Sequence, residues 1–100
     1  MKKIILLCAA GMSTSMLVAK MRECASSEGL ECTIEAFPTS EAIAQASDAD
    51  CILLGPQVRF SKNKISKQCP GVPIDAIDMK VYGRVDGRAA LDLAKSLMGI

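Results

Sequence analysis

The first sixteen residues constrain the fold of this chain more than any other segment. Residues 4–7 form an uninterrupted apolar run, Cys8 follows them, and residues 9–15 are small or hydroxylated apart from Met12. A helical pattern begins at Thr14, so the segment predicts a strand, a tight loop and a helix. Such a turn points several backbone N–H groups inward and forms a site for anions. The sequence therefore places a thiol at the rim of an expected anion site.

The rest of the chain repeats this alternation of strand and helix. We expect strands over 31–37, 51–54 and 72–77, helices over 14–28, 39–47 and 58–69, a loop over 78–85, and a last helix that Asp86 caps. In the helix over 39–47 a hydroxyl of residue 39 or 40 is the expected cap, and Ala42, Ile43 and Ala46 are expected to face the core. Four strand–helix units predict an α/β fold, an open four-stranded parallel sheet with helices on both faces and a phosphatase-like strand–loop–helix phosphate loop.

Length and composition narrow the class of protein. With 100 residues, 50% of them hydrophobic, we expect one domain over 1–100 that buries its core without disulfides. A net charge of +1 does not indicate the basic surface that binds nucleic acid. The absence of histidine argues against a metal site, and we expect no cofactor. Basic residues gather over 59–67, either as a solvated helix face or as a surface for an acidic partner.

The cysteines and the apolar runs indicate where in the cell this protein is expected to act. Five cysteines are an odd number, and none of them forms a C-x-x-C pair, which fits a reducing compartment. No apolar run approaches the roughly 20 residues that a membrane-spanning helix needs. We therefore expect a cytoplasmic protein.

Cys8 differs from the other four cysteines in its expected position. Cys24, Cys32, Cys51 and Cys69 fall within or at the edge of expected elements, where cysteine acts as a small apolar residue. Cys8 ends a strand before a helix N-terminus, where the thiolate is favoured. In parallel sheets ligands bind outside the carboxyl ends of the strands, and the segments 8–13, 55–58 and 78–85 meet at that edge. Cys8 is therefore the candidate nucleophile.

The loop after Cys8 suits a phosphoryl group or another tetrahedral oxyanion. Its backbone N–H groups and hydroxyls are hydrogen-bond donors, and its glycine permits close approach of a ligand. The hydroxyls either cap the helix only or cap it and also contact a phosphate. The candidate phosphate-binding residues are Ala9, Ala10, Gly11, Met12, Ser13, Thr14 and Ser15.

The segment CAAGMSTSM over 8–16 resembles the phosphorylation loop of the enzyme IIB components of the phosphoenolpyruvate-dependent sugar phosphotransferase system, lactose/cellobiose (N,N'-diacetylchitobiose) class. The likeness continues in EAFP over 35–38, LLGPQV over 53–58 and VYGRVDG over 81–87, so it extends over nearly the whole chain. This resemblance implies that the Cys8 thiolate attacks a phosphohistidine of a IIA protein. The phosphocysteine then donates to a sugar hydroxyl held by the membrane component IIC, and the chain is expected to act as a monomer that meets IIC at the inner face of the membrane.

A rival function uses the same strand–loop–helix. Low-molecular-weight tyrosine phosphatases and arsenate reductases of that type require an arginine six residues after the cysteine to clamp the dianion. In this chain that position is Thr14, so the clamp is absent. A receiver module of the response-regulator type is a third alternative, but its acidic cluster at the strand ends is missing.

Four further residues are candidates for secondary roles at the site. Gln57 either orients a phosphate or contacts a partner, or it only rigidifies the loop after Gly-Pro. Tyr82 is either a wall of the site or a surface aromatic that faces a partner. Asp78 would repel a phosphoryl group, so we expect it to cap the loop that follows. Met12 is expected to bury its side chain against IIA and IIC.

Overall fold

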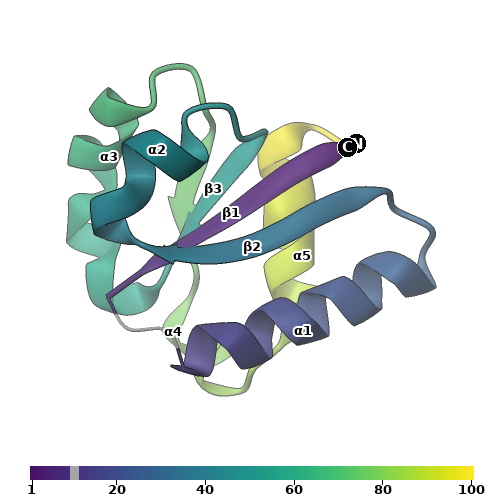
Figure 1. Ribbon diagram of the computed structural model, residues 1–100. Helices are drawn as coiled ribbons and strands as arrows, with labels where there is room; N and C mark the ends of the chain where they lie inside the picture. Colours follow the sequence, from purple (N-terminus) through teal and green to yellow (C-terminus); the bar gives the residue numbers. More distant parts are fainter. Residues whose placement is uncertain (10–11) are drawn as a thin grey trace.

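The computed structural model describes residues 1–9 and 12–100, including every side chain among them except those of Met12 and Ser13. Four parallel strands form one sheet in the order β2-β1-β3-β4 (Figure 1). The strands are β1 (Lys2–Cys8), β2 (Cys32–Pro38), β3 (Cys51–Leu54) and β4 (Ile74–Ala76). The predicted fold is confirmed, although β4 is shorter than the expected 72–77.

The apolar runs form central strands because both faces of the sheet are covered. Along β1, Ile4 and Leu6 pack into one core, whereas Ile5 and Leu7 pack into the other. The first core receives α1 (Met12–Ser27) and α5 (Gly87–Met98), and the second receives α2 (Ala42–Ala46), the 3-10 helix η2 (Pro56–Ser61) and α3 (Lys62–Gln68). Figure 1 shows these two layers on opposite sides of the sheet. The alternation of side chains along a strand thus divides one apolar run between two cores.

A side-chain cap and a network of ion pairs stabilise the layer formed by α1 and α5. The Asp86 side chain accepts a hydrogen bond from the backbone N–H of Ala89 at 3.0 Å, so the predicted cap of the last helix is confirmed. Across the layer, the Glu28 carboxylate binds both Arg88 and Lys95 of α5. Hydrogen bonds from Lys95 and then Arg88 hold the pKa of Glu28 below its ordinary value. This network ties the end of α1 to α5.

The predicted helix over 39–47 is only partly right. The structure has a 3-10 helix η1 (Thr39–Glu41) followed by α2, and neither has a side-chain hydrogen bond as its N-terminal cap. Ala42 and Ala46 are buried as expected, but Ile43 is 61% exposed. In a helix with 3.6 residues per turn, position 43 is rotated by about 100° from position 42 and by about 60° from position 46, which here turns it away from the core that these two alanines enter. The expectation that Ile43 faces the core was wrong for this reason.

The third and fourth connections also differ from expectation. In place of the single helix expected over 58–69, the structure has η2 followed by α3, and Val58 within η2 has a non-helical backbone (φ −119°, ψ 17°). The segment 78–85, expected as a loop, contains a short helix α4 (Met79–Gly83). The Asp78 side chain accepts a hydrogen bond from the backbone N–H of Lys80 at 2.9 Å, so Asp78 does have a capping role, but for a helix. Valine, tyrosine and glycine are weak helix formers, which hides α4 from sequence patterns.

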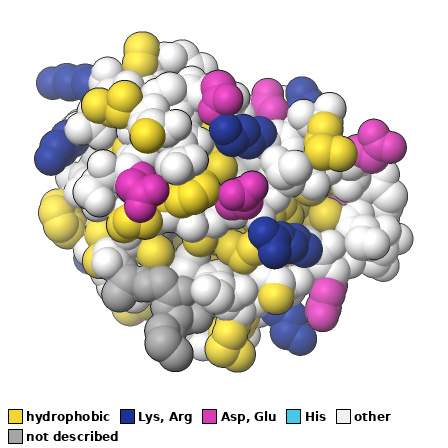
Figure 2. Space-filling model, viewed as in Figure 1, with side chains coloured by type: hydrophobic (Ala, Val, Ile, Leu, Met, Phe, Trp, Pro, Cys, Tyr) yellow, Lys and Arg dark blue, Asp and Glu magenta, His cyan; other side chains and the backbone are white. Residues whose placement is uncertain are grey.

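Two surface properties follow from these elements. Of the helices in the described part of the chain, none has the length and apolar character needed to cross a bilayer. The lysines of α3 are exposed, and Figure 2 shows basic side chains over this helix at the left of the molecule. Lys62 lies 3.3 Å from the carboxylate of Asp75. The basic side chains over 59–67 are thus exposed, which agrees with both interpretations of this cluster.

Candidate functional site

Cys8 is the last residue of β1, which lies in the middle of the sheet. From β1 the chain crosses to β2 on one side and later reaches β3 on the other, so the strand order reverses between β1 and β3. Ligands of doubly wound sheets bind at the carboxyl edge beside such a point. Cys8 is 3% exposed and shares the side of the sheet with Ile4 and Leu6, against which α1 packs. Cys8 therefore lies at the carboxyl edge of the sheet, and α1 begins four residues later at Met12.

The loop after β3 lies directly beside Cys8. The backbone N–H of Gly55 donates to the Leu7 carbonyl oxygen at 2.9 Å, which extends the pairing of β1 and β3 to this edge. A methyl group built on Gly55 would lie 3.4 Å from Cys8 Cβ and 3.1 Å from Gln57 Oε1. Glycine therefore allows the close approach of this loop to Cys8, and the Gln57 amide oxygen lies beside the same glycine.

The helix α4 joins the site through one hydrogen bond. The Thr14 hydroxyl lies 2.9 Å from the Tyr82 hydroxyl, and Thr14, 1% exposed, is the one polar residue that the described part of the chain buries. Thr14 belongs to the first turn of α1, and the four N–H groups at a helix start have no acceptor within the helix. Both interpretations of Tyr82 agree with this contact, because its ring also lines a surface hollow between η2 and α4.

The candidate phosphate-binding residues are described to different extents. Ala9 is exposed directly after Cys8, and Ser15 is exposed in the first turn of α1. Met12 and Ser13 begin α1 by their backbone, and their side chains lie outside the described part. Ala10 and Gly11 lie outside the described residues.

Comparison with known proteins decides the family. The family model described as "PTS system, Lactose/Cellobiose specific IIB subunit" matches residues 3–93. The chain belongs to this family. The predicted resemblance is thereby confirmed, and the sheet edge with Cys8 belongs to a IIB subunit of the phosphotransferase system.

Related proteins of known name support the assignment along the whole chain. The oligo-beta-mannoside-specific EIIB component of Bacillus subtilis (strain 168) is 44% identical over 100 residues, with 98% of this chain and 97% of the relative covered. The galactose-specific EIIB component of Lactococcus lactis subsp. cremoris (strain MG1363) is 42% identical over 104 residues, with 97% and 96% covered. The sugars in these names differ at nearly equal identity, so similarity along this chain does not specify a sugar.

A solved structure has the same fold. The solution structure of the cellobiose-specific phosphotransferase IIB component from Borrelia burgdorferi superposes with a TM-score of 0.81 at 36% identity, with 98% of this chain and 92% of that chain covered.

Beside the site, the IIB chain has a surface hollow, and this hollow was not predicted from the sequence. It has a volume of about 530 Å³ and lies between η2 and α4, with Gln57 and Tyr82 in its wall. Phe60 and Met79, which also line it, are 82% and 64% exposed. The sequence signal was weak, because Phe60 stands among polar neighbours and Met79 lies in a segment without clear periodicity. This apolar lining is the type of surface that a partner protein can cover.

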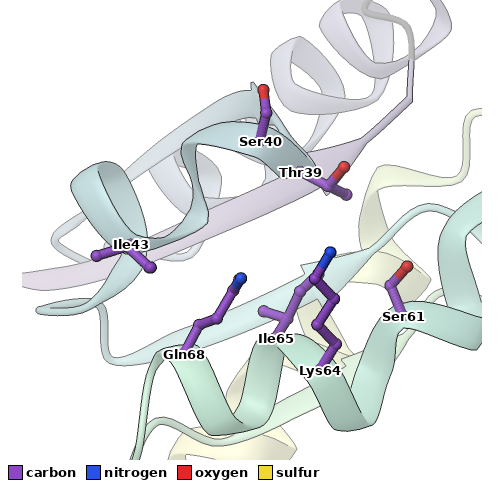
Figure 3. A pocket seen from close by; sticks show the side chains of 7 residues that line it. All are labelled: Thr39, Ser40, Ile43, Ser61, Lys64, Ile65 and Gln68. Atoms are coloured by element: carbon purple, nitrogen blue, oxygen red, sulfur yellow. The ribbon is translucent and has the colours of Figure 1, made fainter.

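A second hollow lies on the other side of the sheet edge. It has a volume of about 350 Å³. Figure 3 shows it between η1 and α2 on one side and η2 and α3 on the other. Lys64 and Gln68 extend from α3 across this hollow toward η1 and α2, and Ile65 lies between them (Figure 3). None of the predicted site residues lines it, so the candidate site is the Cys8 edge.

The other four cysteines have packing roles, as predicted. Cys51 and Cys69 are buried, whereas Cys24 and Cys32 are half-buried against the core of α1 and α5. Burial, and next the negative charge of Asp50, raise the pKa of the Cys51 thiol to about 12. Burial also raises the pKa of Cys32. These two thiols therefore stay protonated near neutral pH and are poor nucleophiles.

Proposed function

We propose that Cys8 is the phosphoryl acceptor of this IIB subunit and that the phosphocysteine passes the group to a sugar. In the first step the nitrogen–phosphorus bond of a phosphohistidine on IIA breaks as the sulfur–phosphorus bond forms. In the second step the sulfur–phosphorus bond breaks as a bond to a sugar oxygen forms, the Cys8 thiolate leaves, and the proton of the sugar hydroxyl passes to solvent water. The sugar is of disaccharide type, such as cellobiose, lactose or diacetylchitobiose, and is held by the membrane component IIC.

One observation carries this proposal, namely the position of Cys8 at the carboxyl end of the central strand, beside the reversal of strand order and before α1. Phosphoryl transfer through a loose transition state needs in-line positioning and neutralisation of charge, and little covalent chemistry from other side chains. Backbone N–H groups at a helix start supply such neutralisation. The chain needs no base of its own once the thiol is ionised.

The loop residues Ala9 to Ser15 form the cradle in this proposal, and Gln57, whose amide oxygen lies beside Gly55 as Cys8 does, orients the bound phosphate. The clamp of the phosphatase alternative has no counterpart, because the sixth residue after Cys8 is Thr14, whose hydroxyl is directed to Tyr82. A cradle made largely of backbone dipoles binds the phosphoryl group less tightly than a bidentate arginine would. This suits an intermediate that must release the group to the next acceptor.

In this proposal the subunit acts as a monomer in the cytoplasm. It meets phosphorylated IIA there and docks transiently on IIC at the inner face of the membrane. Both partners must approach the edge that carries Cys8, so the exposed apolar side chains of the hollow beside it are suited to a transient contact of modest area.

Reconstitution of the phosphoryl chain tests the function. With phosphoenolpyruvate, the two general proteins of the system and the cognate IIA, the chain is expected to gain one phosphoryl group, located on Cys8 by mass spectrometry of its peptides. Addition of membranes that contain IIC and the sugar is then expected to remove it. A chain that gains no phosphate, or gains it on another residue, would contradict the proposal.

Assays with a small phosphate ester separate a carrier from a phosphatase. The isolated chain is expected to show no turnover of p-nitrophenyl phosphate above the buffer rate, because it lacks the clamping arginine. A low-molecular-weight tyrosine phosphatase serves as the positive control. Sustained hydrolysis that disappears in Cys8→Ser would favour the phosphatase and remove the basis of the carrier mechanism.

A further inference from the structure

The contact between Thr14 and Tyr82 joins two segments that are 68 residues apart in the chain. Thr14 lies in the first turn of α1, next to the loop that follows Cys8, and its side chain is buried. A buried hydroxyl without a partner is costly, and the Tyr82 hydroxyl supplies that partner at 2.9 Å. The position of the first turn of α1 is thereby coupled to the position of α4.

The structure holds α4 firmly at both ends. At its start, the side chain and the carbonyl oxygen of Asp78 accept hydrogen bonds from Lys80 N–H at 2.9 Å and Tyr82 N–H at 3.0 Å. At its end, Val85 has a φ of 52°, in the left-handed region that β-branched residues avoid. The Val85 side chain nevertheless packs against the core of α1 and α5. An unfavourable backbone conformation persists where the surrounding structure determines it, and here it directly follows the helix that carries Tyr82.

We infer that Tyr82 is a positioning residue for phosphoryl transfer, whose hydroxyl acts through Thr14 to hold the first turn of α1 in place. This inference rests on the proposed function. The first-turn N–H groups point out of the helix start, so a shift of this turn moves the donors that would neutralise the phosphoryl group. Tyr82 acts indirectly, because its hydroxyl is hydrogen-bonded to that of Thr14. Its ring lines the hollow between η2 and α4, so the same residue connects that surface to the loop.

Phosphoryl transfer from phosphorylated IIA tests the inference through two variants. Tyr82→Phe and Thr14→Val each remove one hydroxyl and keep the shape of the side chain. Each is expected to lower kcat about tenfold with KM for phosphorylated IIA unchanged, because small displacements of positioning groups cost this much or more. The double variant is expected to be no slower than either single variant, since both remove the same hydrogen bond. Thr14→Ser, which keeps a hydroxyl, is expected to restore most of the rate.

Thr33→Val is the matched control. Thr33 is exposed on β2 and pairs in register with Lys3, near the opposite end of the sheet from Cys8. It undergoes the same chemical change as Thr14→Val and is expected to leave kcat and KM as in the wild type. A purely structural hydrogen bond would lower the melting temperature and leave kcat of the folded protein unchanged, so the thermal unfolding of every variant is measured alongside.

A second measurement needs neither partner nor phosphate. The rate of Cys8 alkylation by iodoacetamide in the isolated chain is expected to change by a similar factor in Tyr82→Phe and Thr14→Val, and to stay constant in Thr33→Val. Unchanged kcat and alkylation in folded Tyr82→Phe, or effects that multiply in the double variant, would overturn the inference. If wild-type chain accepts no phosphate from IIA, the proposed function fails, and the alkylation rates still decide whether Tyr82 positions the loop.

Discussion

Cys8→Ser is expected to lose phosphorylation by IIA, with labelling at least about 1000-fold below that of the wild type, as for removal of an essential nucleophile. A serine hydroxyl is a weaker nucleophile than a thiolate and needs an activating base, for which this chain offers no histidine. Oxygen replaces sulfur at a nearly buried position with little change of shape, so the fold is expected to persist. The measurement is incorporation of label from phosphoenolpyruvate, with circular dichroism to verify folding.

Cys24→Ser is the control for this experiment. Cys24 is a half-buried thiol of α1 that packs against the core, away from the carboxyl edge of the sheet. It undergoes the same substitution and is expected to be labelled like the wild type. If Cys8→Ser kept its label while Cys24→Ser lost it, the assignment of the acceptor would be wrong and the loop after β1 would lose its proposed role.

The sheet and the position of Cys8 could be predicted from the sequence because their signals are local. The runs over 4–7 and 51–54 are apolar without interruption, as expected where helices cover both faces. Parallel strands bring their carboxyl ends to the same edge, so the small-residue loop after Cys8 had to lie there. The same reasoning located Gln57 and Tyr82 in neighbouring segments.

The remaining features depend on contacts that no local pattern contains. The helix α4 forms from weak helix-forming residues because Asp78 caps it and its surroundings fix the turn at Val85. The bond from Tyr82 to Thr14 depends on how α4 and α1 lie relative to each other. The outward side chain of Ile43 depends on the start of α2 after a 3-10 turn, and a shift of one residue changes the exposed face.

Gly87→Ala is expected to destabilise the fold although alanine favours helices. Gly87 is the first residue of α5, and a methyl group built there would lie 2.5 Å from the carbonyl carbon of Lys20 and 2.6 Å from its Cβ. Both atoms belong to the rigid part of α1, so the two helices must separate to admit the methyl group. Overpacking of this kind costs about 1–3 kcal/mol. The intrinsic helix propensity of alanine exceeds that of glycine by about 1 kcal/mol at an interior position. This gain is smaller than the upper part of the overpacking cost, so the net effect is expected to be a loss of stability.

Thermal and urea unfolding measure this effect, and Gly83→Ala is the matched control. Gly83 is also a helical glycine, and a methyl group there would meet no atom within 4 Å. We expect the melting temperature of Gly87→Ala to fall by about 8–16 °C, because a net cost of about 2 kcal/mol remains after the propensity gain and 1 kcal/mol corresponds to about 4–8 °C in a domain of this size. Gly83→Ala is expected to be neutral or slightly stabilising. Equal stability of the two variants would show that α1 and α5 are not in close contact at Lys20.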